Sequence, residues 1–223
     1  MTFSNAYRGV KKLFLAEIFM IVAGFVFFAS TLVTAIVTNN PEATTEDLVK
    51  NIGYVIPVLC AGVLTLVAAV INIIGLVQAS KDEAYFSFAL FAVIAGVIVT
   101  ILRTVLSNWS AFADGTLVYT LLETLGSVFE ILVTIFVVYG VIMLSGRLGK
   151  ISGVFAGKRV LNIIIAVYVL IFIMKVLEMI FGKGSAVTQI ESILSIVVSV
   201  LSITGYVLYL ILLGQATKML KNN

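Results

Sequence analysis

The sequence predicts an all-α membrane protein that crosses a lipid bilayer six times. Three observations support this fold class: 61% of the 223 residues are hydrophobic, only 11% are charged, and the mean hydropathy is +1.20. Soluble domains carry about 25% charged residues, so a water-soluble fold of this length could not cover so much apolar surface. We therefore expect residues 1–223 to form a single transmembrane bundle whose main partner is the lipid bilayer.

Six apolar runs are long enough to span the hydrocarbon core, which takes about 20 residues of helix. They cover residues 13–38, 52–79, 85–106, 117–144, 159–181 and 187–213. Helix is expected in each, because an open strand in lipid leaves backbone groups unpaired. The first run could also be a signal peptide, but its apolar part exceeds the usual length of about 7–15 residues. We interpret it as an uncleaved span.

The distribution of basic residues predicts the orientation. The two termini and the second and fourth loops hold ten of them: Arg8, Lys11, Lys12, Lys81, Arg147, Lys150, Lys158, Arg159, Lys218 and Lys221. The first, third and fifth loops hold two, Lys50 and Lys183. Lysine and arginine are enriched in cytosolic loops, so we expect both termini on the cytosolic side of the cell membrane. These charges are interpreted as topology signals, and no nucleic-acid partner is predicted.

The spans are expected to form three helical hairpins that repeat one another, over residues 8–81, 82–147 and 158–219. Each hairpin ends in a similar polar segment, at residues 75–81 (GLVQASK), 140–146 (GVIMLSG) and 212–218 (LLGQATK). The second and third return helices also match, with TLLETLGS at 120–127 and TQIESILS at 188–195. A duplication explains these similarities, and the alternative is chance likeness among apolar helices.

The segments YRGVKKLFLAE (residues 7–17) and GLVQASKD (residues 75–82) resemble motifs of a family of multi-pass membrane proteins from anaerobic Gram-positive bacteria. The resemblance covers about the first 90 residues of the chain. It implies a bacterial origin. The family has no established activity, so the resemblance implies no mechanism.

Glu130 lies near the middle of the fourth span. A charged residue at the bilayer centre costs about 2.5–3.5 kcal/mol, so it needs a structural or functional reason. Steps of three and four residues place it on one helix face with Thr120, Glu123, Ser127 and Thr134. We expect this face to point into the bundle, either lining a pathway with Glu130 as an ion or proton site, or packing against other helices.

A second polar stripe follows the sixth span at the same spacing. Its members are Thr188, Ser192, Ser195, Ser199, Ser202, Tyr206 and Tyr209. The same two interpretations apply: the stripe lines a pathway, or its small hydroxyl residues let helices approach closely.

A cluster of charges is expected nearer the outer surface. It comprises Arg103, Glu123, Lys175, Glu178 and Glu191. Opposite charges on partner helices favour ion pairs within each hairpin, and the alternative is the mouth of a site for a charged solute. Glu17 is expected to pair locally or to extend toward the interface, since Lys12 lies about one turn away. Asn72 is expected to hydrogen-bond between helices.

Several kinds of chemistry are excluded or disfavoured. The chain has no histidine, so imidazole catalysis and histidine metal ligands are excluded, and its one cysteine, Cys60, can form no intramolecular disulfide. Cys60 is expected to be a small packing residue. Glu123 and Glu130 are about 10 Å apart along one helix, too far for a catalytic pair. We predict no enzyme activity, no cofactor and no metal site.

The fourth loop is rich in glycine and ends in Lys158 and Arg159. Its glycines are Gly146, Gly149, Gly153 and Gly157. Their spacing departs from that of a phosphate-binding loop, and no strand precedes them. We interpret the segment as a flexible basic loop that touches anionic lipid headgroups.

Two functions remain after these exclusions. Six spans and an intramembrane acid favour a transporter or channel for a small solute or ion, or a membrane subunit of one. The alternative is a membrane scaffold, assembly or stress-response protein that transports nothing, in which the polar residues serve packing.

Overall fold

A computed structural model gives the structure of residues 3–38, 52–107, 117–181 and 185–221. Within these ranges it describes all side chains except those of residues 33–38, 52–54, 117, 120, 175–181 and 185–191. The described residues form six α-helices: α1 (Ser4–Thr38), α3 (Ile52–Ala79), α4 (Ala84–Ser107), α5 (Leu117–Arg147), α6 (Ile151–Phe181) and α7 (Ser185–Lys221). Each is long and apolar enough to cross a membrane. The prediction of an all-α polytopic membrane protein is confirmed.

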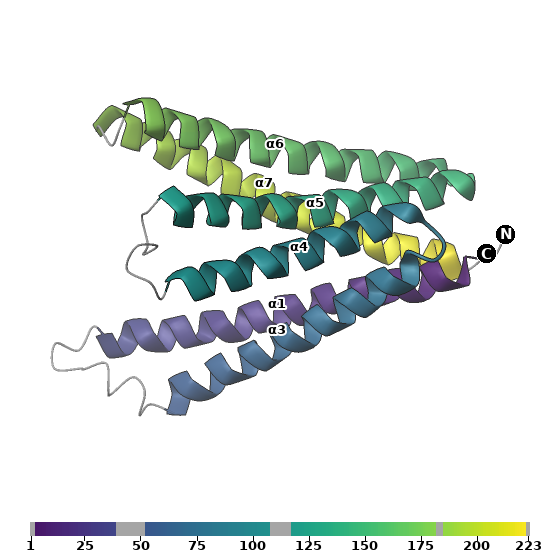
Figure 1. Ribbon diagram of the computed structural model, residues 1–223, viewed down its shortest axis with the longest axis horizontal. Coiled ribbons are helices and arrows are strands. Elements are labelled where there is room, and N and C mark those ends of the chain that lie inside the picture. Colours follow the sequence, from purple (N-terminus) through teal and green to yellow (C-terminus); the bar gives the residue numbers. More distant parts are fainter. Residues whose placement is uncertain (1–2, 39–51, 108–116, 182–184, 222–223) are drawn as a thin grey trace.

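The helices pair as α1 with α3, α4 with α5 and α6 with α7 (Figure 1). Each helix contacts the next along the chain, and α7 contacts α1, so the six helices close into a ring. The contact between α3 and α4 is the least extensive in this ring. Both termini lie at one end of the bundle, which we call the terminal end, and α3 diverges from α4 toward the opposite end (Figure 1).

The buried core lies in the terminal half of the bundle. Fully buried side chains include Leu13 of α1, Leu76 of α3, Phe86 of α4, Leu144 of α5 and Leu213 of α7. All five lie within about three turns of the terminal ends of their helices. The helices are therefore tightly packed at the terminal end and more open toward the opposite end.

Large apolar side chains cover the outside of the ring. Phe25 is 72% exposed, Phe172 68% and Ile203 67%. Water would solvate such a surface poorly, whereas lipid tails match it. Cys60 is also exposed, so the expectation that it packs between helices is wrong. A thiol is apolar enough to face lipid.

Glycines let the helices of a hairpin touch. A Cβ atom added at Gly9 of α1 would lie 2.5 Å from the carbonyl oxygen of Gly75 in α3, and one added at Gly75 would lie 3.0 Å from the Leu13 side chain. In the second hairpin, a Cβ atom at Gly140 of α5 would lie 2.7 Å from the ring of Phe86 in α4. Small residues at such contacts are typical of membrane helix pairs, because close backbone approach maximises van der Waals contact.

The fourth loop is shorter than expected. Helix α6 begins at Ile151, so only residues 148–150 separate it from α5, with Gly149 at a φ of 64°. Gly153 and Gly157 are helical, and their Cα atoms face Ser145 and Ile142 of α5. The prediction of a flexible glycine-rich loop is therefore wrong. These two glycines allow close helix contact instead of chain flexibility.

The loop between α3 and α4 ties three helices together at the terminal end. Asp82 accepts hydrogen bonds from the backbone N–H of Ala6 (2.7 Å) and from the side-chain amide of Asn5 (3.1 Å), and so caps the first turn of α1. Glu83, whose side chain is 3% exposed, forms an ion pair with Arg147 of α5 at 3.0 Å. Arg147 also donates to the carbonyl oxygen of Asp82 at 3.3 Å. This contact network holds the first two hairpins together.

Candidate functional site

Glu17 of α1 is bonded to a residue from the other end of the chain. The hydroxyl of Tyr206 in α7 donates a hydrogen bond of 2.8 Å to its carboxylate. Tyr209, one turn further along α7, is buried and lies within electrostatic reach of the same carboxylate. Because α1 and α7 are neighbours in the ring, this bond joins the first hairpin to the third. The expectation that Glu17 pairs locally with Lys12 is wrong.

Glu17 also lines a cavity of about 490 Å³ between α1, α3, α4 and α5. Glu130 of α5 lines the same cavity, and so does Asn72 of α3. We call this space the central cavity. Its remaining wall consists of Met20, Thr65, Ala68, Ala69, Ile73, Ala92, Val93, Gly96, Val97, Thr100, Ile101, Gly126, Phe129 and Val133. The tertiary structure thus brings two acids from different hairpins to one space.

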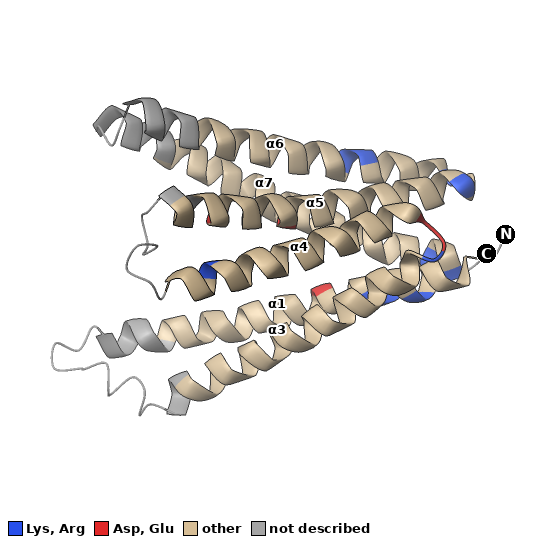
Figure 2. Cartoon of the chain, viewed as in Figure 1, with Lys and Arg blue, Asp and Glu red and all other residues tan. Residues whose placement is uncertain are grey.

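Both acids lie deep along their helices. At about 1.5 Å per residue, Glu17 is about 20 Å and Glu130 about 25 Å from the terminal ends of α1 and α5. The hydrocarbon core of a bilayer is about 30 Å thick. Helices α1 and α5 have 35 and 31 residues and are about 52 and 46 Å long. When the apolar layer is centred on them, both carboxylates lie inside it. Figure 2 shows acidic residues in the middle part of α1 and α5, away from the basic residues at the terminal end.

The central cavity has an acidic character. Among the residues that the structure describes, no lysine or arginine lines it, while two carboxylates do. The Asn72 side-chain oxygen is buried and has no hydrogen-bond partner in the described part of the chain, so the expected interhelical bond to that oxygen is not formed. Such a site favours positive charge and offers an unused hydrogen-bond acceptor.

The other members of the Glu130 stripe do not line the central cavity. The hydroxyl of Ser127 donates to the backbone carbonyl of Glu123 at 3.1 Å, and that of Thr134 to the carbonyl of Glu130 at 3.3 Å. Both bonds stay within α5. Glu123, Ser127 and Glu130 are all exposed, so the expectation that this face points into the packed interior of the bundle is wrong for these three residues. Of the predicted stripe, only Glu130 reaches the cavity, and the side chain of Thr120 lies outside the described residues.

The serine stripe of α7 is placed on an exposed face. Ser192, Ser195, Ser199 and Ser202 are exposed and lie outside the lining of the central cavity. The Ser199 hydroxyl donates to the carbonyl of Ser195 at 2.8 Å. Tyr206 is the member of the stripe that contacts an acid, through its bond to Glu17. These four serines therefore do not line the central cavity together with Glu130, and the side chain of Thr188 lies outside the described residues.

The outer charge cluster is described only in part. The side chains of Lys175, Glu178 and Glu191 lie outside the described residues. The guanidinium of Arg103 lies over the ring of Tyr119 at 5.8 Å, a cation–π contact between α4 and α5. This contact links α4 and α5. The expected ion pair between Arg103 and Glu123 is not formed among the described residues.

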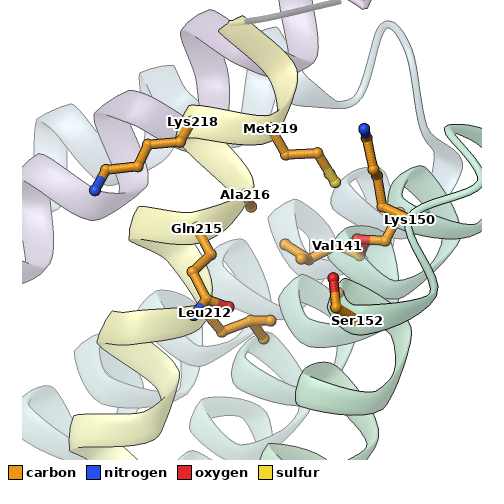
Figure 3. Close-up of a pocket in the computed structure, with 10 residues that line it drawn as sticks. Val141, Lys150, Ser152, Leu212, Gln215, Ala216, Lys218 and Met219 are labelled. Carbon is orange, nitrogen blue, oxygen red and sulfur yellow. The ribbon is translucent and has the colours of Figure 1, made fainter.

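A second, smaller cavity lies at the terminal end between α5, α6 and α7. It has a volume of about 340 Å³, and its wall includes Lys150, Ser152, Gln215 and Lys218. The side chains of Lys150 and Lys218 extend away from each other (Figure 3), so the two ammonium groups do not converge on one point. The Ser145 hydroxyl in this wall already donates to the carbonyl of Val141 at 2.8 Å. This cavity is a weaker candidate than the central one.

Sequence reasoning missed two features of the site. Glu17 lies close to the basic residues Lys11 and Lys12, which made a local role plausible. The position of Glu17 along the helix is the signal that could have identified it as a candidate site residue. It lies more than three helical turns from the start of α1. The convergence of Asn72 with the two acids had no signal in the sequence, since helix neighbours in a ring depend on the fold.

No family model, curated protein or solved structure matches the chain. Its function is therefore inferred from its own residues.

Proposed function

We propose that the protein is a membrane transporter or channel for a small solute or ion, and that the central cavity is its binding site for a positively charged species. The observation that carries this proposal is the presence of Glu17 and Glu130 in one cavity at the depth of the hydrocarbon layer. Each charge costs about 2.5–3.5 kcal/mol at the bilayer centre. A bound cation or proton offsets this cost, whereas packing alone needs no second carboxylate.

The shape of the bundle supports the same proposal. The terminal end is closed by the buried core and by the ion pair between Glu83 and Arg147. Toward the opposite end α3 diverges from α4 (Figure 1). The lining residues Ile73, Val97 and Ile101 are exposed, so the cavity opens to the surface of the bundle between α3 and α4. A transport site must be accessible in at least one of its states.

We also propose that the terminal end faces the cytosol. The basic residues whose side chains are described gather there, with Arg103 as the exception (Figure 2). Lysine and arginine near span ends are enriched on the cytosolic side. In this orientation the central cavity lies beyond the tightly packed terminal core, farther from the cytosol.

The test is flux through purified protein in proteoliposomes. Glu130→Gln keeps the size of the side chain and one acceptor oxygen, replaces the other oxygen with a donor NH2 group, and removes the charge. We expect wild-type protein to support cation- or pH-coupled uptake, and Glu130→Gln to reduce the initial rate at least about tenfold, since one full charge at this depth is removed. Glu17→Gln should have a similar effect.

Glu123→Gln is the matched control. Glu123 lies on the same helix two turns away and is exposed, as Glu130 is, but it does not line the cavity. Its variant should retain most of the wild-type rate. Equal rates in wild type and Glu130→Gln, or the absence of any flux above protein-free liposomes, would count against transport through this site.

A further inference from the structure

The wall of the central cavity is mostly apolar. Of its lining residues, the polar ones are Glu17, Thr65, Asn72, Thr100 and Glu130. The others are aliphatic or aromatic residues or glycine, among them Met20, Ile73 and Phe129. The volume of about 490 Å³ falls in the range of about 300–1,000 Å³ that is typical of small-molecule sites. The cavity is thus large and apolar, with charge at two points.

This wall is poorly suited to a bare metal cation. Small cations need about six oxygen ligands at close range to replace their hydration shell. The hydroxyls of Thr65 and Thr100 already donate to backbone carbonyls of their own helices, at 2.9 Å each, which fixes their orientation. The remaining oxygens come from three side chains on three helices. Most of the surface offers van der Waals contact instead of coordination.

The same wall suits an organic cation with apolar substituents. Burial of apolar area contributes about 25 cal/mol per Å², and the carboxylates of Glu17 and Glu130 attract the charge in a medium of low dielectric constant. Phe129 also lines the cavity, and aromatic rings attract cations that approach their faces. A neutral ligand would leave two carboxylates without a counter-charge, and an anion would be repelled by both.

We infer that the central cavity binds a lipophilic organic cation, whose charge lies between Glu17 and Glu130 and whose apolar groups lie against α3 and α4. This inference names the substrate class of the proposed transport site and therefore rests on the proposed function. Exposed lining residues on α3 (Ile73) and α4 (Val97 and Ile101) open the cavity to the lipid layer, into which such a ligand partitions.

The experiment uses tetraphenylphosphonium and tetraphenylborate, two ions of nearly the same shape and opposite charge. Their binding to the full chain in nanodiscs is measured by equilibrium dialysis, with protein-free nanodiscs subtracted. We expect saturable binding of the phosphonium and none of the borate. Glu17→Gln and Glu130→Gln should each weaken phosphonium binding at least about tenfold, while Glu123→Gln should change it less than about twofold.

The comparison of the two ions in wild-type protein needs no variant, so a variant that fails to fold leaves the test intact. Equal binding of phosphonium and borate, or no saturable phosphonium binding, overturns the inference. Phosphonium binding that is unchanged in both Gln variants overturns it as well.

Failure of the inference and failure of the proposed function have different outcomes. If protons or alkali cations cross the membrane in a Glu130-dependent manner without phosphonium binding, the transport proposal stands and the substrate class is wrong. If phosphonium binds in a Glu-dependent manner but no solute crosses, the binding site stands and the transport proposal fails.

Discussion

At the residue scale, the bond between Tyr206 and Glu17 is the contact that most changes the interpretation of the chain. A carboxylate within a span needs a donor, because lipid supplies none. The donor comes from a residue 189 positions away, at 2.8 Å. Lys12, which is one turn away in the sequence, is not the partner. The phenol thus holds one of the two cavity acids in place.

Removing this donor should destabilise the protein measurably. Tyr206→Phe keeps the ring and removes the hydroxyl, so we expect the free energy of unfolding to fall by about 1 kcal/mol, in line with interhelical hydrogen bonds in membranes. The measurement is reversible unfolding of the purified protein by SDS in mixed micelles. In a double-mutant cycle, Tyr206→Phe should cost close to nothing when Glu17 is already Met. A loss of the same size in both backgrounds would show that the hydroxyl contributes through another contact.

At the element scale, the hairpins depend on glycines where two helices touch. Gly75 and Gly140 each begin one of the similar hairpin-end segments, and each contacts the first helix of its own hairpin, through Leu13 and Phe86 respectively. A duplication would produce this correspondence. The three-hairpin duplication itself stays a prediction.

Enlarging one of these glycines should separate the second hairpin. In Gly140→Ala the new methyl group would lie 2.7 Å from the ring of Phe86, which is fully buried and cannot move away. We expect the free energy of unfolding to fall by about 1–3 kcal/mol from overpacking. Unfolding in SDS mixed micelles measures it.

Gly126→Ala is the control on the same helix. Nothing lies within 4 Å of a Cβ atom at that position, and alanine favours helix over glycine by about 1 kcal/mol. This variant should be neutral or stabilising. Similar losses in the two variants would mean that α5 needs glycine for backbone reasons and not for its contact with Phe86.

At the scale of the whole molecule, the two ends of the bundle differ. The terminal end has the buried core, the loop that caps α1 and nearly all the described basic side chains. The middle of the bundle has the acids of the central cavity (Figure 2). This asymmetry of charge predicts a fixed orientation of the bundle in the membrane.

The orientation can be tested with reporter fusions in a bacterial host. Because basic loops stay in the cytosol, fluorescent-protein fusions at the N-terminus and at the C-terminus should both fluoresce. Alkaline phosphatase, which folds only outside the cytosol, should be inactive at both termini and active when inserted within residues 39–51. Active phosphatase at either terminus would contradict the predicted cytosolic position of that terminus.

Much of the fold could be predicted from composition and run length. The predicted second span coincides with α3, because apolar residues continue from Ile52 to Ala79 and polar residues follow. The start of α6 was missed by eight residues, since glycine and basic residues at its beginning are typical of loops in an isolated sequence. In the bundle, Gly153 and Gly157 are favoured in a helix by contact with α5.

The candidate site could be predicted only for Glu130. Its depth within one span marks it as costly, and this property is local to the helix. The spacing of three and four residues also selected Ser127 and Thr134. Their hydroxyls donate hydrogen bonds within α5 and do not line the cavity. Period alone identifies residues that share a face, but it does not say which neighbour that face meets.

The spans, their apolar outer surface and the asymmetry of charge follow from the chain alone, because lipid requires helices of a given length and excludes unpaired charge. The order of helices around the ring depends on contacts between residues far apart in the chain, which no local pattern encodes. That order brings Glu17 from α1 to Glu130 from α5 and to Tyr206 from α7. The membrane thus accounts for the elements, and side-chain contact between hairpins accounts for the site.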